Sequence, residues 1–212
     1  MRSAVNVKTN PSSGRFVLTR LHSLSGVIPL GLFLLEHFFS NATAIIGEEN
    51  FNNTVNLIQS IPFLIIFEFV LIALPLLFHA IYGLYIAFTS VSNASHYSYR
   101  RNWFFLFQRI SGVITLIFVV YHVWSFRIAT AIHDQPVNYQ LVSEHLQNPL
   151  IFLFYLLGVV STAFHFSNGL ATSLITWGIT IGKKSQYVAS QLSLGLFLLL
   201  STAGIGILMA FI

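Results

Sequence analysis

Four histidines lie deep inside apolar runs of the sequence, one in each of four separate runs. They are His37, His79, His122 and His165. A lone imidazole at membrane depth is costly unless it has a partner, so four of them predict a shared binding function. Imidazole nitrogen is a ligand of haem iron, and helix bundles build such cofactor sites from side chains on facing helices.

Two of these histidines are predicted to lie far from the cytoplasmic edge of the membrane. His37 lies 16 residues past Leu21, and His122 lies 19 residues past Trp103. At the rise of an α-helix, both are roughly 24–28 Å from that edge. We call His37 and His122 the outer pair.

The other two histidines are predicted to lie nearer the cytoplasmic edge, because their runs cross in the opposite direction. His79 precedes Thr89 by 10 residues, and His165 precedes Trp177 by 12. Both are therefore roughly 15–18 Å from the edge. We call His79 and His165 the inner pair.

Two pairs of histidines at two depths on four antiparallel helices are what two b-type haems with two axial imidazoles each require. Gly83 follows His79 by four residues and Gly169 follows His165 by four, so each glycine shares a helix face with its histidine. A missing side chain there lets a flat macrocycle approach the backbone. The alternative is that each histidine bonds a backbone carbonyl across the bundle. Four histidines matched by depth favour ligation of haem iron.

Glu68 and three arginines are further candidates for a site. Glu68 precedes His79 by 11 residues, about three turns of a regular helix, which predicts the same side of the helix nearer the outer surface. A carboxylate there can carry protons to or from a quinone, or can simply bond a neighbouring helix. Arg127 can pair with propionates of an outer haem or anchor its helix at the interface. Arg20 and Arg109 can meet propionates of an inner haem or a docked subunit.

The remaining histidines do not fit the two tiers. His22 stands at the predicted cytoplasmic start of the first run, which is too shallow for pairing with the deep histidines. His96, His133 and His145 fall in polar segments and are expected to be solvated.

Five apolar helices must position these residues. Hydrophobic residues make up 55% of the chain and charged residues only 8%, whereas a soluble domain has about a quarter of its residues charged. The 22-residue run 103–124 rises about 33 Å as a helix and has Trp at both ends, as membrane spans do. The sequence predicts an all-α bundle of five transmembrane helices. The expected units are a basic N-terminal segment, 1–20, and one transmembrane domain, 21–212, with spans at about 21–41, 61–89, 103–126, 149–177 and 188–212.

The charges predict the orientation of this bundle. Nine of the ten Lys and Arg residues fall on one side of a five-span topology, and Arg127 alone falls on the other. Positive charge marks the cytoplasmic side, so the N-terminus is expected in the cytoplasm and the C-terminus outside. The chain has no Cys, which excludes disulfides and iron–sulfur clusters held by this chain. The basic charge is accounted for by orientation and gives no reason to expect nucleic acid as a partner.

Several stretches resemble a known family. RLHSLSGVIPLGLFLLEH, PLLFHAIYGLYIAF, YSYRRNWFFLFQRISGVITLIFVVYHVW and FHFSNGL are similar to the dihaem cytochrome b membrane anchor of succinate dehydrogenase, in its Bacillus-type form. The family is related to the anchors of quinol:fumarate reductases. The resemblance covers about residues 15–210, and the four deep histidines fall where the family has its axial ligands.

The resemblance implies a function that spacing cannot give. Such an anchor holds a flavoprotein and an iron–sulfur subunit at the cytoplasmic face of a bacterial membrane. It carries electrons from the iron–sulfur subunit through two haems b to menaquinone in the respiratory chain, or in reverse for fumarate reduction. The dicarboxylate site of the tricarboxylic acid cycle reaction lies on a partner chain.

Two other classes remain open from the residues alone. Another b-type cytochrome, such as the membrane arm of a hydrogenase or formate dehydrogenase, also uses paired histidines. A transporter with structural histidines would carry no haem.

Overall fold

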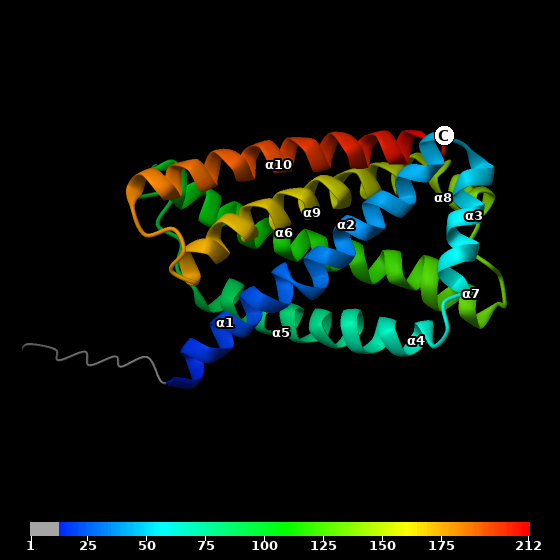
Figure 1. Ribbon diagram of the computed structural model, residues 1–212. Helices are drawn as coiled ribbons and strands as arrows, with labels where there is room; N and C mark the ends of the chain where they lie inside the picture. Colours follow the sequence, from blue (N-terminus) through cyan, green and yellow to red (C-terminus); the bar gives the residue numbers. More distant parts are fainter. Residues whose placement is uncertain (1–12) are drawn as a thin grey trace, which may run out of the picture.

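The computed structural model describes residues 13–212 and is helical throughout its regular structure, without strands in that range. Five stretches of helix are long and apolar enough to cross a membrane, which confirms the predicted fold class. They are Gly14–Ile45, Leu64–Thr89, Arg100–Ile132, Pro149–Thr176 and Lys183–Met209. In Figure 1 these stretches run along the length of one bundle.

The first span is made of two helices that meet at a proline. They are α1 (Ser13–Val27) and α2 (Pro29–Ala42), and a 3₁₀ turn, η1 (Thr43–Ile45), follows. Pro29 occupies the first turn of α2, where its missing N–H does not interrupt the hydrogen-bond ladder. The first span is thus two helices joined just before Pro29.

The boundary predicted at residue 20 does not coincide with the start of the first helix. α1 begins at Ser13, eight residues before Leu21, so Arg15 and Arg20 are helical. Polar and basic residues tolerate a helix that projects beyond the hydrocarbon core, and apolar pattern alone misses such an extension. Arg2 and Lys8, two of the nine basic residues predicted on the cytoplasmic side, lie outside the described residues.

The second and third spans each include a π-helical stretch. The second span consists of α4 (Leu64–Phe67), η2 (Glu68–Ala73) and α5 (Leu74–Thr89). The third consists of α6 (Arg100–Val123), η3 (Trp124–Ile128) and α7 (Ala129–Ile132). The two spans run in opposite directions, so both π stretches lie toward the same end of the bundle. A π turn closes with an i→i+5 bond and changes the direction in which side chains point.

The fourth and fifth spans are uninterrupted helices. α9 (Pro149–Thr176) packs along both α6 and α10 (Lys183–Met209). Small polar residues line the α9–α10 contact, and the Ser193 hydroxyl donates to the Ser167 carbonyl at 2.8 Å. Such small residues let membrane helices approach closely. Large apolar side chains on the outer surface of the bundle remain exposed, as a lipid-facing surface requires.

Two short helices cover one end of the bundle, which we call the capped end. They are α3 (Glu48–Gln59) and α8 (Tyr139–Leu146), in segments that lie between the predicted spans. The Asn138 side chain accepts from the Leu141 N–H at 2.8 Å and so caps α8. Figure 1 shows α3, α7 and α8 together at this end, near the end of α10.

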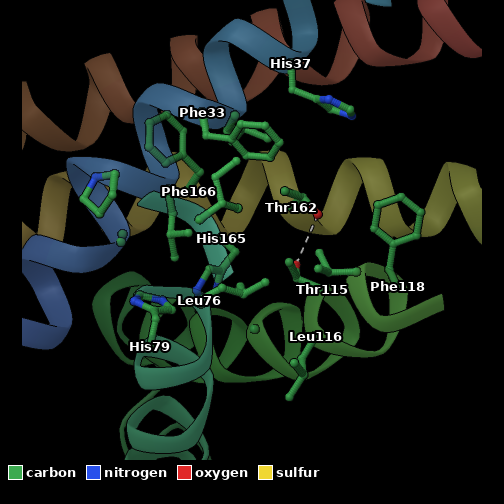
Figure 2. A pocket seen from close by; sticks show the side chains of 18 of the residues that line it. Phe33, His37, Leu76, His79, Thr115, Leu116, Phe118, Thr162, His165 and Phe166 are labelled. Carbon is green, nitrogen blue, oxygen red and sulfur yellow. Dashed lines mark hydrogen bonds between the residues drawn. The ribbon is translucent and has the colours of Figure 1, made fainter. Parts of the chain in front are cut away.

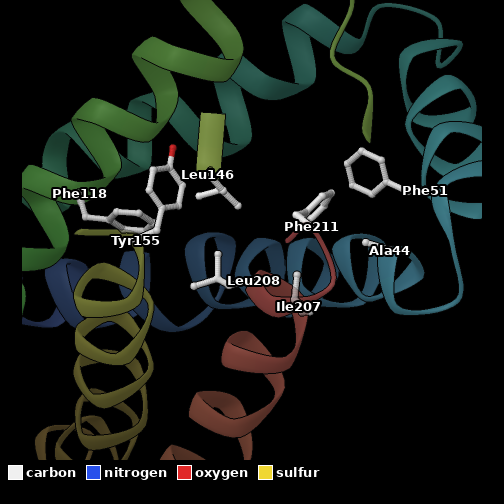
Figure 3. Packing of buried hydrophobic residues seen from close by; sticks show 8 residues of the cluster. All are labelled: Ala44, Phe51, Phe118, Leu146, Tyr155, Ile207, Leu208 and Phe211. Atoms are coloured by element: carbon white, nitrogen blue, oxygen red, sulfur yellow. The ribbon is translucent and has the colours of Figure 1, made fainter. Parts of the chain in front are cut away.

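The capped end is closed by hydrogen bonds and by apolar packing. The Tyr139 N–H donates to Asn52 Oδ1 of α3 at 2.8 Å, and the Ser143 hydroxyl donates to the Phe211 carbonyl at 2.6 Å. Phe51, Leu146 and Phe211 are at most 3% exposed and belong to one cluster, which Figure 3 shows. This end of the bundle is therefore a packed lid over the interior.

Candidate cofactor site

All four deep histidines line one cavity between the spans. Its volume is about 2250 Å³, whereas sites for small molecules commonly have about 300–1000 Å³. The space is therefore large enough for more than one bulky group. Figure 2 shows His79 and His165 close together, with His37 at another level of the cavity.

The outer pair brings α2 and α6 together. The ring centroids of His37 and His122 are 5.6 Å apart, and the ring planes are nearly perpendicular at 81°. Asn41 Nδ2 donates to the His37 carbonyl at 2.7 Å, which places its amide beside the His37 ring. His122 Nδ1 is buried and has no hydrogen-bond partner among the described residues. Both rings thus line the cavity, where their nitrogen atoms can bind a metal.

The inner pair brings α5 and α9 together. The ring centroids of His79 and His165 are 6.2 Å apart, with an interplanar angle of 89°. His165 Nδ1 donates to the Gln108 carbonyl at 3.0 Å, and His79 Nδ1 donates to the His22 carbonyl at 3.1 Å. A carbonyl oxygen can only accept, so Nδ1 carries the hydrogen in both rings and Nε2 keeps its lone pair.

These carbonyl bonds reconcile the two explanations offered for deep histidines. Each inner histidine does bond a backbone carbonyl across the bundle, yet the bond uses only Nδ1. Histidines that ligate metals almost always donate their other N–H in this way, which fixes the ring and raises its basicity. The carbonyl bonds therefore prepare Nε2 of each inner histidine to bind a metal.

The residues fit two haems on geometric grounds. Metal–imidazole bonds are about 2 Å long, so two rings on opposite sides of one metal atom have centres roughly 6 Å apart. The separations of 5.6 and 6.2 Å agree with this value. Two imidazoles are fewer ligands than the four that a bare structural metal ion takes, whereas a tetrapyrrole supplies the remaining nitrogens itself.

The glycines predicted to face a macrocycle lie against polar side chains in this structure. A Cβ atom at Gly83 would be 3.1 Å from His22 Cε1, and one at Gly169 would be 3.3 Å from Gln108 Nε2. Both glycines nevertheless line the cavity. The i+4 spacing predicted that each glycine lies on the same helix face as its histidine, and both do line the cavity. The spacing could not predict which side chain of a neighbouring helix lies against the glycine.

Different glycines lie directly against the inner pair. A Cβ atom at Gly26 would be 2.5 Å from His79 Cε1, and one at Gly112 would be 2.8 Å from His165 Cε1. Each inner ring therefore packs onto bare backbone of a neighbouring helix.

His22 is not too shallow to meet the deep histidines, so that prediction was wrong. Its ring stacks on His79, with centroids 4.1 Å apart and planes at 15°. α1 begins at Ser13, which places His22 nine residues into the helix, and His79 lies ten residues before the end of α5 at Thr89. The two distances from the helix ends, about 14 and 15 Å along the axis, are nearly equal.

Glu68 and Arg127 form an ion pair between the second and third spans. Arg127 Nε and Nη2 donate to the same carboxylate oxygen, Glu68 Oε2, at 2.9 and 2.6 Å. Both residues line the cavity. The helix between Glu68 and His79 includes the π stretch η2, so the angular count that assumed a regular helix does not hold there.

The two other predicted arginines, Arg109 and Arg20, lie in different places. Arg109 lines the cavity, its guanidinium lies 3.4 Å over the Phe105 ring, and its buried Nε has no hydrogen-bond partner among residues 13–212. Arg20 is not among the residues that line this cavity, and its guanidinium lies over the rings of Phe16 and Trp177. The structure therefore brings Arg109 to the site and places Arg20 at a separate surface.

Two of the three histidines expected to be solvated are exposed, namely His96 and His133. The expectation was wrong for His145, which is a half-buried residue of α8 whose Nε2 is hydrogen-bonded with the Tyr121 hydroxyl at 3.3 Å. Burial lowers the pKa of the His145 imidazole. The segment forms a helix and folds back onto the bundle, which a polar composition does not reveal.

Sequence reasoning missed an amide network behind the inner pair. Gln108 Nε2 donates to the His165 carbonyl at 3.0 Å, and Asn168 Nδ2 donates to Gln108 Oε1 at 2.6 Å. A lone amide inside an apolar run was the available signal, because a buried amide needs partners on a neighbouring helix.

Comparisons with known proteins identify relatives of this chain. Residues 92–204 match the profile of a family described as the succinate dehydrogenase/fumarate reductase transmembrane subunit. The chain is also 47% identical over 197 residues to the succinate dehydrogenase cytochrome b558 subunit of Bacillus subtilis (strain 168). That alignment covers 93% of this chain and 97% of the relative.

Proposed function

Because the chain belongs to the family of succinate dehydrogenase/fumarate reductase transmembrane subunits, it is a membrane-anchor subunit of that oxidoreductase, and we propose that it holds two haems b and serves a quinone. Membership of this family decides against the hydrogenase-type arm and the transporter. The observation that carries the proposal is the presence of two facing imidazole pairs, 5.6 and 6.2 Å between centroids, on one cavity.

The four deep histidines are the proposed ligands of haem iron. His37 and His122 would hold one haem, and His79 and His165 would hold the other. When bound, each haem supplies a one-electron redox centre within the bilayer. The Gln108 and His22 carbonyls fix the inner rings by accepting from Nδ1. Arg109 is positioned at the cavity wall with an N–H that a haem propionate can accept from.

The end of the bundle opposite the capped end is the proposed docking face for the partner subunits. Arg100, Arg101, Lys183 and Lys184 lie at this end, at the starts of α6 and α10. Excess Lys and Arg mark the cytoplasmic side. The flavoprotein and iron–sulfur subunits therefore dock on this end, at the cytoplasmic face of the bacterial cytoplasmic membrane. The capped end faces outside.

The quinone is proposed to react toward the capped end, close to the outer pair. Electrons enter from the cytoplasmic face, so a second redox centre farther out is useful only when the acceptor lies beyond it. Menaquinone takes up two electrons, which succinate oxidation supplies, and two protons to become menaquinol. Glu68 lines the cavity at this level and is the proposed proton carrier. The reverse sequence of the same steps describes fumarate reduction.

The test is to purify the complete complex from the membrane and quantify its haem. Two haems b per chain, measured as pyridine haemochrome, and reduction of both by succinate support the proposal. A ratio near one removes one of the two pairs from the cofactor site. Absence of haem, with succinate dehydrogenase activity intact, rules out the ligation altogether.

A further inference from the structure

The Glu68–Arg127 ion pair uses only part of its bonding capacity. Two N–H groups of Arg127 converge on the single oxygen Oε2, at 2.9 and 2.6 Å. No described residue donates to Glu68 Oε1 or accepts from Arg127 Nη1. A guanidinium has five donors and a carboxylate has two oxygens, so the pair retains a charged donor and a charged acceptor side by side.

The pair stands where a lipid-soluble molecule can reach it. Its side chains are 29% exposed for Glu68 and 42% exposed for Arg127. The exposed neighbours along the two spans are large and apolar; they include Phe67, Phe69 and Ile128. Both members of the pair also line the cavity that holds the outer pair. The ion pair thus borders the lipid on one side and the cofactor cavity on the other.

The local backbone is a second, independent indication of a functional site here. Glu68 opens the π stretch η2, and Arg127 lies within the π stretch η3. π-helical segments are rare and occur frequently at functional sites. Two of them, on different spans, bring one charged residue each to the same point.

We propose that Glu68 and Arg127 together bind the polar head of the quinone, with Arg127 as the group that recognises the oxidised form. A quinone carbonyl oxygen accepts from Arg127 Nη1. The quinol hydroxyl, which can also donate, bonds Glu68 Oε1. One site therefore holds both redox states of the ligand. The inference rests on the proposed function, because it adds Arg127 to the quinone site proposed near Glu68.

The competing explanation is a structural latch. An ion pair between two spans can simply hold their ends together, and it would then have no contact with a ligand. A test must therefore separate the stability of the complex from its affinity for quinone.

The experiment compares three variants in the purified complex: Arg127→Gln, Arg127→Lys and the charge exchange Glu68→Arg with Arg127→Glu. The probe is a short-chain naphthoquinone analogue of menaquinone. Three quantities are measured, namely its equilibrium Kd, its KM and kcat with succinate, and the midpoint temperature of thermal unfolding.

Loss of Arg127 should weaken binding of the analogue. Arg127→Gln removes a charge-assisted hydrogen bond, so Kd and KM should rise about ten- to a hundredfold. Arg127→Lys keeps an ion pair with Glu68 but loses the several N–H donors of the guanidinium. Kd should therefore rise while the unfolding midpoint stays near that of the wild type. The charge exchange should restore the midpoint without restoring Kd, because donor and acceptor have changed places.

Several outcomes overturn the inference. A charge exchange that restores both the midpoint and Kd shows a latch. A Kd within about twofold of the wild-type value in Arg127→Gln and Arg127→Lys shows that Arg127 does not touch the quinone. If the charge exchange does not assemble, Arg127→Lys alone decides. Failure of the wild-type complex to reduce the analogue would instead contradict the proposed function.

Discussion

Gly26 lies so close to His79 that a Cβ atom on residue 26 would be 2.5 Å from the Cε1 atom of the ring. The contact joins α1 to α5, two helices of different spans. Because His79 has been proposed as a ligand, the size of the side chain at position 26 determines where the imidazole can stand. The same relation links Gly112 to His165, at 2.8 Å.

Gly26→Ala and Gly112→Ala should therefore disturb the inner haem and spare the outer one. A methyl group at either position forces the ring or the backbone to move, at a cost of about 1–3 kcal/mol. The measurement is the midpoint potential and low-temperature spectrum of each haem. Gly195→Ala is the matched control, since a Cβ atom there would have no atom of the described residues within 4 Å. Unchanged spectra in the first two variants would show that the ring tolerates the methyl group.

Removal of single histidines should divide the variants into two classes. His79→Ala and His165→Ala should each abolish or alter the inner haem, whereas His37→Ala and His122→Ala should affect the outer one. Redox titrations of the four complexes check this assignment. Loss of the same component in His37→Ala and His79→Ala, with the other left intact, would contradict the pairing.

Glu68→Gln should keep both haems and their reduction by succinate, yet lower the kcat of quinone reduction by about a hundredfold or more, since a positioned proton-transfer group contributes about 10²–10⁴-fold. The amide keeps the size of the side chain but cannot carry a proton. The rates of haem reduction and of quinone reduction are measured separately in the same preparation. Glu144→Gln, a change in an exposed carboxylate of α8, serves as the control. Full quinone reductase activity in Glu68→Gln would remove the residue from the mechanism.

The capped end should lose stability in acid through His145. Burial lowers the pKa of this imidazole in the folded protein, so the unfolded chain, with a pKa of about 6.5, binds the proton more readily. The contribution is therefore complete above about pH 6.5 and declines as the pH falls toward the lowered pKa. Hydrogen exchange of α8 amides across this range measures the effect. His145→Gln should flatten the dependence, and an unchanged slope would assign it to other groups.

The sequence predicts well which histidines of different spans pair, because their depth along the helices is enough to decide it. Counting residues from the end of each apolar run placed His37 level with His122 and His79 level with His165, and the structure brings these rings within about 6 Å. The rise of a helix is constant, so depth survives small errors in the ends. The same count failed for His22, because the start of α1 lies among polar residues that hydropathy does not assign to a helix.

Rotation about a helix is less predictable than depth. The prediction for Glu68 assumed 3.6 residues per turn, and η2 lies between it and His79. Nothing in the composition of residues 68–73 indicates a π stretch, so its pairing with Arg127 could not be inferred. The helices α3 and α8 were missed for a similar reason. Both helices pack against residues that follow α10, far along the chain. Tyr139 and Ser143 of α8 donate to the Ala210 and Phe211 carbonyls, and Phe51 of α3 contacts the Phe211 ring.

Because each histidine pair joins alternate spans, the two pairs are completed at different times during synthesis of the protein. Each histidine pair joins helices that are two spans apart in the sequence, α2 with α6 and α5 with α9. Spans leave the ribosome in sequence, from the N-terminus onward. The ligands of the outer pair are therefore complete once the third span has been inserted, whereas those of the inner pair must wait for the fourth. α8 and the end of α10, which close over the outer pair, follow the third span. Topology alone thus gives the outer pair a period during biogenesis when it is formed but not yet covered.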